Sequence, residues 1–78
     1  MSISIIGEII SERRAKLKLT QSQLAARCSI SQPLIARIES GTKTDINLNS
    51  LKEFARAFGC TGSELLSEIE QREKSRAA

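Results

Sequence analysis

The hydrophobic positions of the chain recur at the spacing of amphipathic helices. In each segment, apolar residues return every three or four positions, so that they share one side of a helix. In the first segment the expected stripe contains Ile6, Ile10, Arg14 and Leu17. The predicted helices cover residues 5–17, 21–28, 32–40, 48–58 and 62–72. The fold class expected from this pattern is all-α, with five helices.

Polar residues mark the predicted helix starts. Thr20 and Gln23 form a capping box, in which each side chain bonds the backbone amide of the other residue. The segment from Thr61 to Glu64 repeats this device, and its flanking Cys60 and Leu65 form a hydrophobic staple. The other starts are assigned to Ser4, Ser31 and Asn47.

Two glycines and the single proline agree with these boundaries. Gly41 and Gly59 follow the third and fourth helices, where a left-handed residue commonly ends the last turn. Pro33 falls in the first turn of the third helix. Proline is tolerated there because first-turn amides have no intrahelical partner. Pro33 therefore helps to start the helix rather than break it.

The size and composition of the chain indicate one small globular domain. Its 78 residues are 40% hydrophobic and 27% charged, which is ordinary for a folded domain and excludes a disordered chain. The predicted domain covers residues 1–72, and residues 73–78 form a charged tail that is expected to fray.

Positive charge is concentrated in the first half of the chain. Residues 1–43 contain seven basic and three acidic residues, a balance of +4, whereas residues 44–78 contain five and six, a balance of −1. This asymmetry favours one surface that faces a polyanion. A solvated basic helix would give the same pattern, so the charge alone does not decide between them.

The sequence offers no recognisable metal or catalytic chemistry. The chain has no histidine, and Cys28 and Cys60 are too far apart for zinc-finger or thioredoxin-like spacing, so no metal or cofactor is expected. The two cysteines are interpreted as small core residues in a reducing, cytoplasmic compartment. With no glycine-rich phosphate loop either, an enzyme is disfavoured. The N-terminal segment indicates a helix start, not a signal peptide, and no stretch approaches a membrane span.

The predicted third helix has a face suited to DNA. Ile35 and Ile38 point in one direction, toward the core, while the opposite direction carries Pro33, Ala36 and Arg37, with Gln32 at its edge. Glutamine and arginine can bond adenine and guanine edges, and small side chains allow close approach to the groove. A merely solvated face is the alternative interpretation.

The chain resembles the Cro/repressor-type (XRE-like) helix-turn-helix domains of phage repressors and small bacterial regulators. Two runs carry the resemblance, TQSQLAARCSISQPLIARIESG and LNSLKEFARAFGCTGSELL, and the similarity covers Ile6 to Ile69. It implies a compact five-helix bundle of the lambda repressor-like type, whose third helix reads the major groove.

The resemblance also implies roles for individual residues. Gln32, Pro33, Ala36 and Arg37 match base-contacting positions. The positions that match phosphate contacts are Gln21, Ser31, Thr42, Lys43 and Thr44. Gln21 also matches the position that braces the first recognition residue. Arg14 and Glu39 match an ion pair that ties the first helix to the recognition helix, which would place Glu39 inside the scaffold.

The chain departs from the usual family pattern at several positions. Lys18 and Ser29 stand where the family commonly has glycine, so either each adopts a strained left-handed backbone or the local turn differs. The loop from Thr42 to Asn47 is about one residue longer than usual and contains Asp45, which is expected to weaken phosphate contact there. Since Pro33 has no hydrogen-bonding side chain, sequence discrimination should rest on Gln32 and Arg37.

The function predicted from these features is a cytoplasmic transcriptional regulator, by default a repressor. It would read a palindromic DNA operator as a homodimer, because one recognition helix covers only a few base pairs. The last helix is the expected interface, through Leu66 and Ile69, although these residues could instead complete the core. One alternative is an antitoxin, with the charged tail and the surface of Ile3, Ile5 and Ile9 contacting the toxin. The other is a restriction–modification controller that contacts RNA polymerase.

Overall fold

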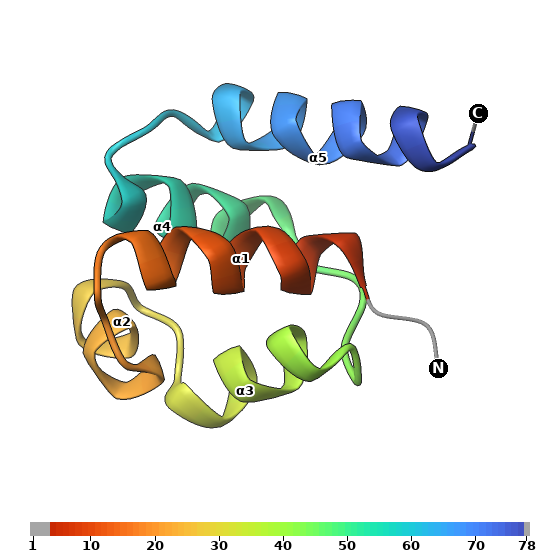
Figure 1. The fold of residues 1–78 in the computed structure, drawn as a ribbon. Helices are drawn as coiled ribbons and strands as arrows, with labels where there is room; N and C mark the ends of the chain where they lie inside the picture. Colours follow the sequence, from red (N-terminus) through yellow and green to blue (C-terminus); the bar gives the residue numbers. More distant parts are fainter. Residues whose placement is uncertain (1–3, 78) are drawn as a thin grey trace.

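The computed structural model describes residues 4–77, which form five helices and no strand, so the predicted all-α fold class is confirmed (Figure 1). The helices are α1 (Ile5–Lys16), α2 (Gln21–Arg27), α3 (Gln32–Ser40), α4 (Leu48–Phe58) and α5 (Gly62–Ala77). Helix α1 packs against α3, α4 and α5, whereas α2 packs against α3. Helix α1 thus connects α3, and through it α2, to the two C-terminal helices.

Each predicted capping residue is found at its helix start. Thr20 and Gln23 form the reciprocal capping box, and Thr61 and Glu64 form a second one. The side chains of Ser4, Ser31 and Asn47 each accept a hydrogen bond from an amide in the following turn. These local bonds satisfy first-turn donors, which explains why all five helices begin where the sequence predicts.

The buried face of α1 differs from the predicted stripe. Ile9 and Ile10 are both buried, whereas Ile6 is half-buried and Leu17 is 42% exposed. The reason is that α1 packs against α3 on one side and against α4 and α5 on the other, so its buried face is wider than a single stripe. Leu17 is the residue that caps the helix end and lies outside these contacts.

This wider face also corrects the predicted toxin contact. Ile9 is 1% exposed and belongs to the core, so it is not available to a partner. Ile5 is partly buried against the same core. Ile3 lies outside the described residues.

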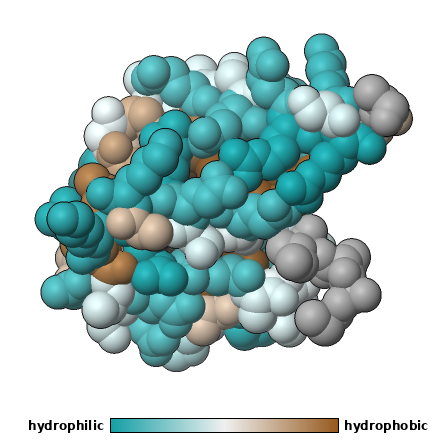
Figure 2. Space-filling model, viewed as in Figure 1, coloured by the Kyte–Doolittle hydropathy of each residue, from teal (hydrophilic) through white to brown (hydrophobic). Residues whose placement is uncertain are grey.

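The core lies where α1, α3, α4 and α5 meet, and α2 closes one end. Its largest fully buried side chains are Phe54, Ile9, Ile10, Leu24, Ile35, Ile38 and Leu65. Cys28 is buried among them, and burial raises the pKa of its thiol. Hydrophilic side chains cover most of the outer face over α1 and α5 (Figure 2). The fold is therefore an ordinary bundle with an apolar interior and a polar surface.

Helices α1 and α3 approach each other at backbone distance. A Cβ atom built on Gly7 of α1 would lie 2.3 Å from the carbonyl oxygen of Ile38 and 3.2 Å from that of Glu39. Only a residue without a side chain fits at this crossing. Gly7 therefore sets how closely α3 sits on the rest of the bundle.

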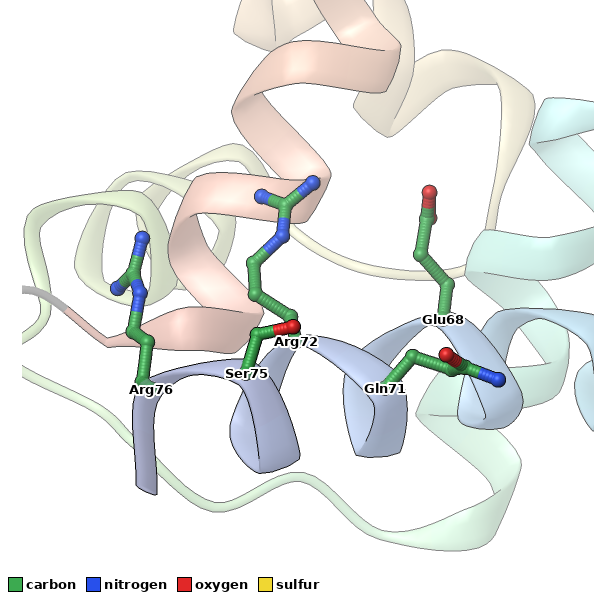
Figure 3. Close-up of a pocket in the computed structure, with 5 residues that line it drawn as sticks. All are labelled: Glu68, Gln71, Arg72, Ser75 and Arg76. Carbon is green, nitrogen blue, oxygen red and sulfur yellow. The ribbon is translucent and has the colours of Figure 1, made fainter. Parts of the chain in front are cut away.

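Helix α5 continues to Ala77, so residues 73–77, which were predicted to belong to a frayed tail, are helical in the structure. Arg72 makes a two-bond ion pair with Glu12 of α1, and Arg76 pairs with Glu8 one turn further along. Figure 3 shows both arginines extended from α5 toward α1. The hydrogen bond from Arg76 lowers the pKa of Glu8, so this pair persists at neutral pH and is lost in acid.

The two positions where glycine was expected have different outcomes. Lys18 adopts the left-handed conformation with φ of 57° and accepts the strain. Ser29 does not adopt positive φ; the preceding Cys28 is extended, and the Ser29 amide donates to the carboxylate of Glu53 on α4. The turn between α2 and α3 thus has a local geometry that needs no glycine.

Candidate nucleic-acid interface

Helix α3 is short, and local sequence fixes both of its ends. Ser31 caps its start by accepting a hydrogen bond from the Leu34 amide, and Pro33 lies in its first turn. Gly41 ends it in the left-handed conformation with φ of 84°. The helix has nine residues, so it presents little more than two turns to a ligand.

The two sides of α3 have opposite character. Ile35 and Ile38 are fully buried and hold the helix on the core. On the other side, Pro33 and Arg37 are exposed, and Ala36 is half-buried between them. Small and cationic side chains therefore form the outer face, which is the composition that close approach to a DNA groove requires.

Arg37 is the cation at the centre of this face. Its backbone carbonyl accepts hydrogen bonds from Ser40 and Lys43, but its side chain has no hydrogen bond or ion pair within residues 4–77. A guanidinium with no internal partner keeps all five of its donors for a ligand. The chemistry that matches it is a guanine edge or a phosphate.

Gln32, the other predicted base reader, is held by a neighbour. Its side-chain Nε2 donates to the side-chain Oε1 of Gln21 at 2.9 Å. The side-chain Nε2 of Gln21 in turn donates to the carboxylate of Glu39 at 3.0 Å. Gln32 keeps one N–H and its carbonyl oxygen, which are the donor and the acceptor needed for a bidentate contact with adenine. Gln21 also keeps one N–H, which is available to a phosphate.

Glu39 faces the scaffold, away from the outer face of α3. Its oxygens accept from Arg14 Nε at 2.7 Å and Nη2 at 2.9 Å, and its side chain is only 8% exposed. Arg14 also donates to the Leu19 carbonyl at 2.8 Å, and its pKa is raised, chiefly by the hydrogen bond to Glu39. A continuous chain of bonds thus runs from Gln32 through Gln21 and Glu39 to α1.

The residues predicted to contact phosphates flank α3 at both ends. Ser31 is exposed before its first turn, and Thr42 and Thr44 are exposed in the loop after Gly41. Lys43 is half-buried, and its ammonium lies 3.5 Å from the carboxylate of Asp45. Asp45 was expected to weaken phosphate contact in this loop, and the structure places it in an ion pair with Lys43, a partner that the sequence analysis did not name.

The two predicted interface residues have different environments. Ile69 is 8% exposed and completes the core, so it is not a surface residue. Leu66 is 43% exposed and lines an apolar hollow beside α4. Only Leu66 of this pair is accessible to a second molecule.

The described residues carry neither a metal-binding cluster nor a membrane-spanning helix. Within residues 4–77, histidine, cysteine and acidic side chains do not gather in any group of three that could hold a metal ion. None of the helices in this range is long and apolar enough to cross a membrane.

Comparison with known proteins gives one family match. A family model described as helix-turn-helix (HTH_3) matches residues 10–65, which is well over half of the chain. The matched region starts in α1, contains α2, α3 and α4 in full, and ends in the first turn of α5. No curated protein matches the chain.

Proposed function

We propose that this chain, which belongs to the XRE-type helix-turn-helix family of DNA-binding transcriptional regulators, acts as a repressor on a palindromic operator. The family match confirms the resemblance found in the sequence. In the proposed complex, two copies bind together, and each inserts α3 into the major groove. Transcription is blocked because the bound dimer occupies the promoter.

The observation that carries the proposal is the division of charge on α3. The one carboxylate of the helix, Glu39, is bonded internally by Arg14 and Gln21, while the Arg37 side chain on the opposite side has no partner among residues 4–77. A helix arranged in this way does not repel phosphates and offers a donor fork to bases.

Each side chain on this face has a proposed partner. Gln32 would contact an adenine edge, Arg37 a guanine edge, and Pro33 and Ala36 thymine methyl groups. Phosphates on either side of the groove would be bound by Gln21, Ser31, Thr42, Lys43 and Thr44.

Selection of bound sequences from a random pool of DNA duplexes tests the proposed function. The expected result is an enriched palindrome whose half-sites lie about one helical turn, or about 34 Å, apart. Failure to enrich any sequence would overturn the proposal of sequence-specific binding. Enrichment of a single half-site would leave DNA reading intact and remove the dimeric operator.

Replacing Arg37 with alanine is expected to weaken binding to the selected site by about 1–3 kcal/mol and to relax specificity at one base pair. The reason is that the lost guanidinium has no structural role within the described residues. Fluorescence anisotropy on the site and on its single-base variants measures both effects. Lys74→Ala, which removes an exposed cation from α5, is the matched control and should bind like the wild type. Unchanged binding by Arg37→Ala would mean that the reading face is wrongly assigned.

Replacing Lys43 with alanine is expected to weaken binding to all duplexes by a similar factor. A phosphate contact carries no sequence information, so the ratio of specific to non-specific affinity should stay constant. The slope of log affinity against log salt should become shallower by about one unit. A titration series in salt measures this slope, and a change confined to one sequence would contradict the phosphate role.

A further inference from the structure

The turn between α2 and α3 is anchored on both sides of an exposed residue. Cys28 and Ile30 are buried in the core, whereas Ser29 between them is exposed. Within residues 4–77 the Ser29 amide donates to no backbone carbonyl. An amide between two helices is bonded either by another part of the protein or by water. Here a side chain of the protein supplies the acceptor.

That side chain is Glu53, in the second turn of α4. Its Oε1 accepts from the Ser29 amide at 3.1 Å, and among residues 4–77 this is the one hydrogen bond that joins α4 to α2, α3 or the turn between them. The same oxygen accepts from Arg56, one turn further along α4. The hydrogen bond from the Ser29 amide and then that from Arg56 lower the pKa of Glu53, so the carboxylate is charged at neutral pH. A bond to a charged acceptor is stronger than one between neutral groups.

Packing does not hold the turn on this side. A polar hollow of about 380 Å³ lies between the turn and the start of α4, and Ser29, Ile30, Asn49 and Glu53 are among the residues that line it. Helix α4 packs mainly against α1 and α5. The bond from Glu53 therefore crosses a place that side chains do not fill, and its loss would leave the Ser29 amide to solvent.

The position of this turn matters because the residues that start α3 follow it directly. Ser31 caps the helix, and Gln32 is its first residue. Arg37 lies more than one turn further along, in the part of α3 that Ile35 and Ile38 fix in the core. A shift of the turn should therefore displace the near end of the reading face more than the region of Arg37.

We propose that Glu53 is a positioning residue for DNA reading, which holds the Ser29 backbone from α4 and thereby fixes the start of α3. The family pattern has glycine at position 29, where a left-handed residue can make the turn by itself. In this chain Ser29 does not adopt positive φ, and an acceptor from another helix holds a different backbone path. The inference rests on the proposed function, since it names a residue that prepares α3 for the major groove.

Equilibrium binding of the full chain to the selected duplex tests this role. Glu53→Ala should weaken binding by about five- to tenfold, because the turn must then be ordered without its acceptor. Removal of a carboxylate also raises the net charge of the chain, which by itself would strengthen binding to DNA. The expected weakening is therefore opposite in sign to the charge effect. Glu53→Gln makes the same change in charge but keeps an acceptor oxygen, and it should bind within about twofold of the wild type.

Two further variants serve as controls. Arg56→Ala removes the ion pair but leaves the bond to Ser29, and Glu70→Ala removes an exposed carboxylate from α5. Both should bind within about twofold of the wild type. Circular dichroism melts establish that every variant is folded at the temperature of the assay. Equal weakening by Glu53→Ala and Glu53→Gln, or no weakening by either, would overturn the role of Glu53.

The specificity profile gives a readout that a loss of stability alone does not change. A less stable protein binds every duplex more weakly by the same factor. In Glu53→Ala, discrimination between bases should fall at the base pair that Gln32 reads and stay near the wild-type ratio at the pair that Arg37 reads. The two pairs are identified from the profiles of Gln32→Ala and Arg37→Ala on single-base variants of the site. Equal losses at both pairs would contradict a displaced start of α3.

A double-variant cycle tests whether glycine makes Glu53 unnecessary. In a Ser29→Gly background, Glu53→Ala should have little effect on binding, because glycine can adopt the left-handed backbone. Ser29→Ala is the matched background, since it keeps both the amide and the restrictions of a side chain. The full effect of Glu53→Ala should remain there. Equal effects of Glu53→Ala in the two backgrounds would overturn the inference.

Hydrogen exchange at the Ser29 amide, followed by NMR without DNA, separates this inference from the proposed function. The amide should exchange more slowly in the wild type and in Glu53→Gln than in Glu53→Ala. If the chain selects a palindrome while Glu53→Ala binds like the wild type, only the role of Glu53 fails. If the chain selects no DNA sequence, the proposed function fails, and the exchange rates still decide whether Glu53 holds the turn.

Discussion

Gly7→Ala is expected to lower the free energy of unfolding by about 3 kcal/mol. Helix propensity alone would predict that alanine stabilises α1 by about 1 kcal/mol relative to glycine. The expected loss of stability is therefore opposite in sign to the propensity effect. The added Cβ would lie 2.3 Å from the backbone oxygen of Ile38, and a backbone atom cannot turn aside as a side chain can. Helices α1 and α3 would have to separate, which opens space around Ile35 and Ile38.

Urea unfolding followed by circular dichroism measures this effect. For a domain of this size, a loss of 3 kcal/mol corresponds to a fall in Tm of at least about 12 °C. Gly62→Ala is the matched control, because a Cβ there meets only Lys52 Cγ at an ordinary 3.5 Å. That variant should be neutral or slightly stabilising. Equal stability of the two alanine variants would show that α1 and α3 are not in backbone contact.

Glu39→Ala is expected to cost about 2–3 kcal/mol of stability and to weaken operator binding as well. Removing one partner of a largely buried ion pair is costly because the other charge is left without compensation. Arg14 keeps its bond to the Leu19 carbonyl and some contact with solvent, so the cost should fall below the upper range for such pairs. Binding should also suffer because Gln21 loses the acceptor that orients it toward Gln32.

The double variant Arg14→Leu/Glu39→Leu separates the ion pair from simple loss of packing. Replacing both charges with apolar groups of similar volume is often close to neutral, so the double variant should be more stable than Glu39→Ala. Glu12→Ala is the surface control; it loses an exposed pair with Arg72 and should cost less than about 1 kcal/mol. A double variant less stable than the single one would contradict this account.

The start of every helix could be predicted from the sequence because the signals for it are local. Thr20 and Thr61 have their bonding partners three residues away, and Ser31 needs only the next turn of its own helix. The orientation of α3 could be predicted for the same reason, since Ile35 and Ile38 define its buried side without knowledge of the other helices.

What the sequence did not predict depends on contacts between distant segments. Ile9 is buried because α1 is surrounded by other helices, and α5 extends to Ala77 alongside carboxylates that lie 60 and 68 residues before its arginines. Lys18 and Ser29 both stand where the family pattern has glycine, so the expectation from the sequence was the same for each. Only the Ser29 amide, however, has Glu53 of α4 within hydrogen-bonding distance. Such differences follow from tertiary packing, which the hydrophobic periodicity of the sequence does not show.

The candidate site also contains some features that local sequence predicts and others that it does not. The outer face of α3 follows from helical geometry, whereas the inward turn of Glu39 was supplied by family resemblance. The resemblance likewise implied that Gln21 braces the first recognition residue, and the structure has the corresponding bond between the Gln32 and Gln21 side chains. Helical periodicity alone does not predict this bond, because the two residues are eleven positions apart on different helices. The sequence indicated that Asp45 would weaken phosphate contact in its loop, and the structure adds that Asp45 pairs with Lys43 itself.

Gln32 and Arg37, the two proposed base readers, are attached to the fold unequally, and this difference bears on how such a regulator would acquire a new target in evolution. Gln32 belongs to the chain of bonds that reaches Arg14, so exchanging it disturbs the scaffold as well as the contact with DNA. Arg37 has no such ties. Drift in operator preference should therefore begin at position 37, where new side chains can be sampled without a penalty in folding.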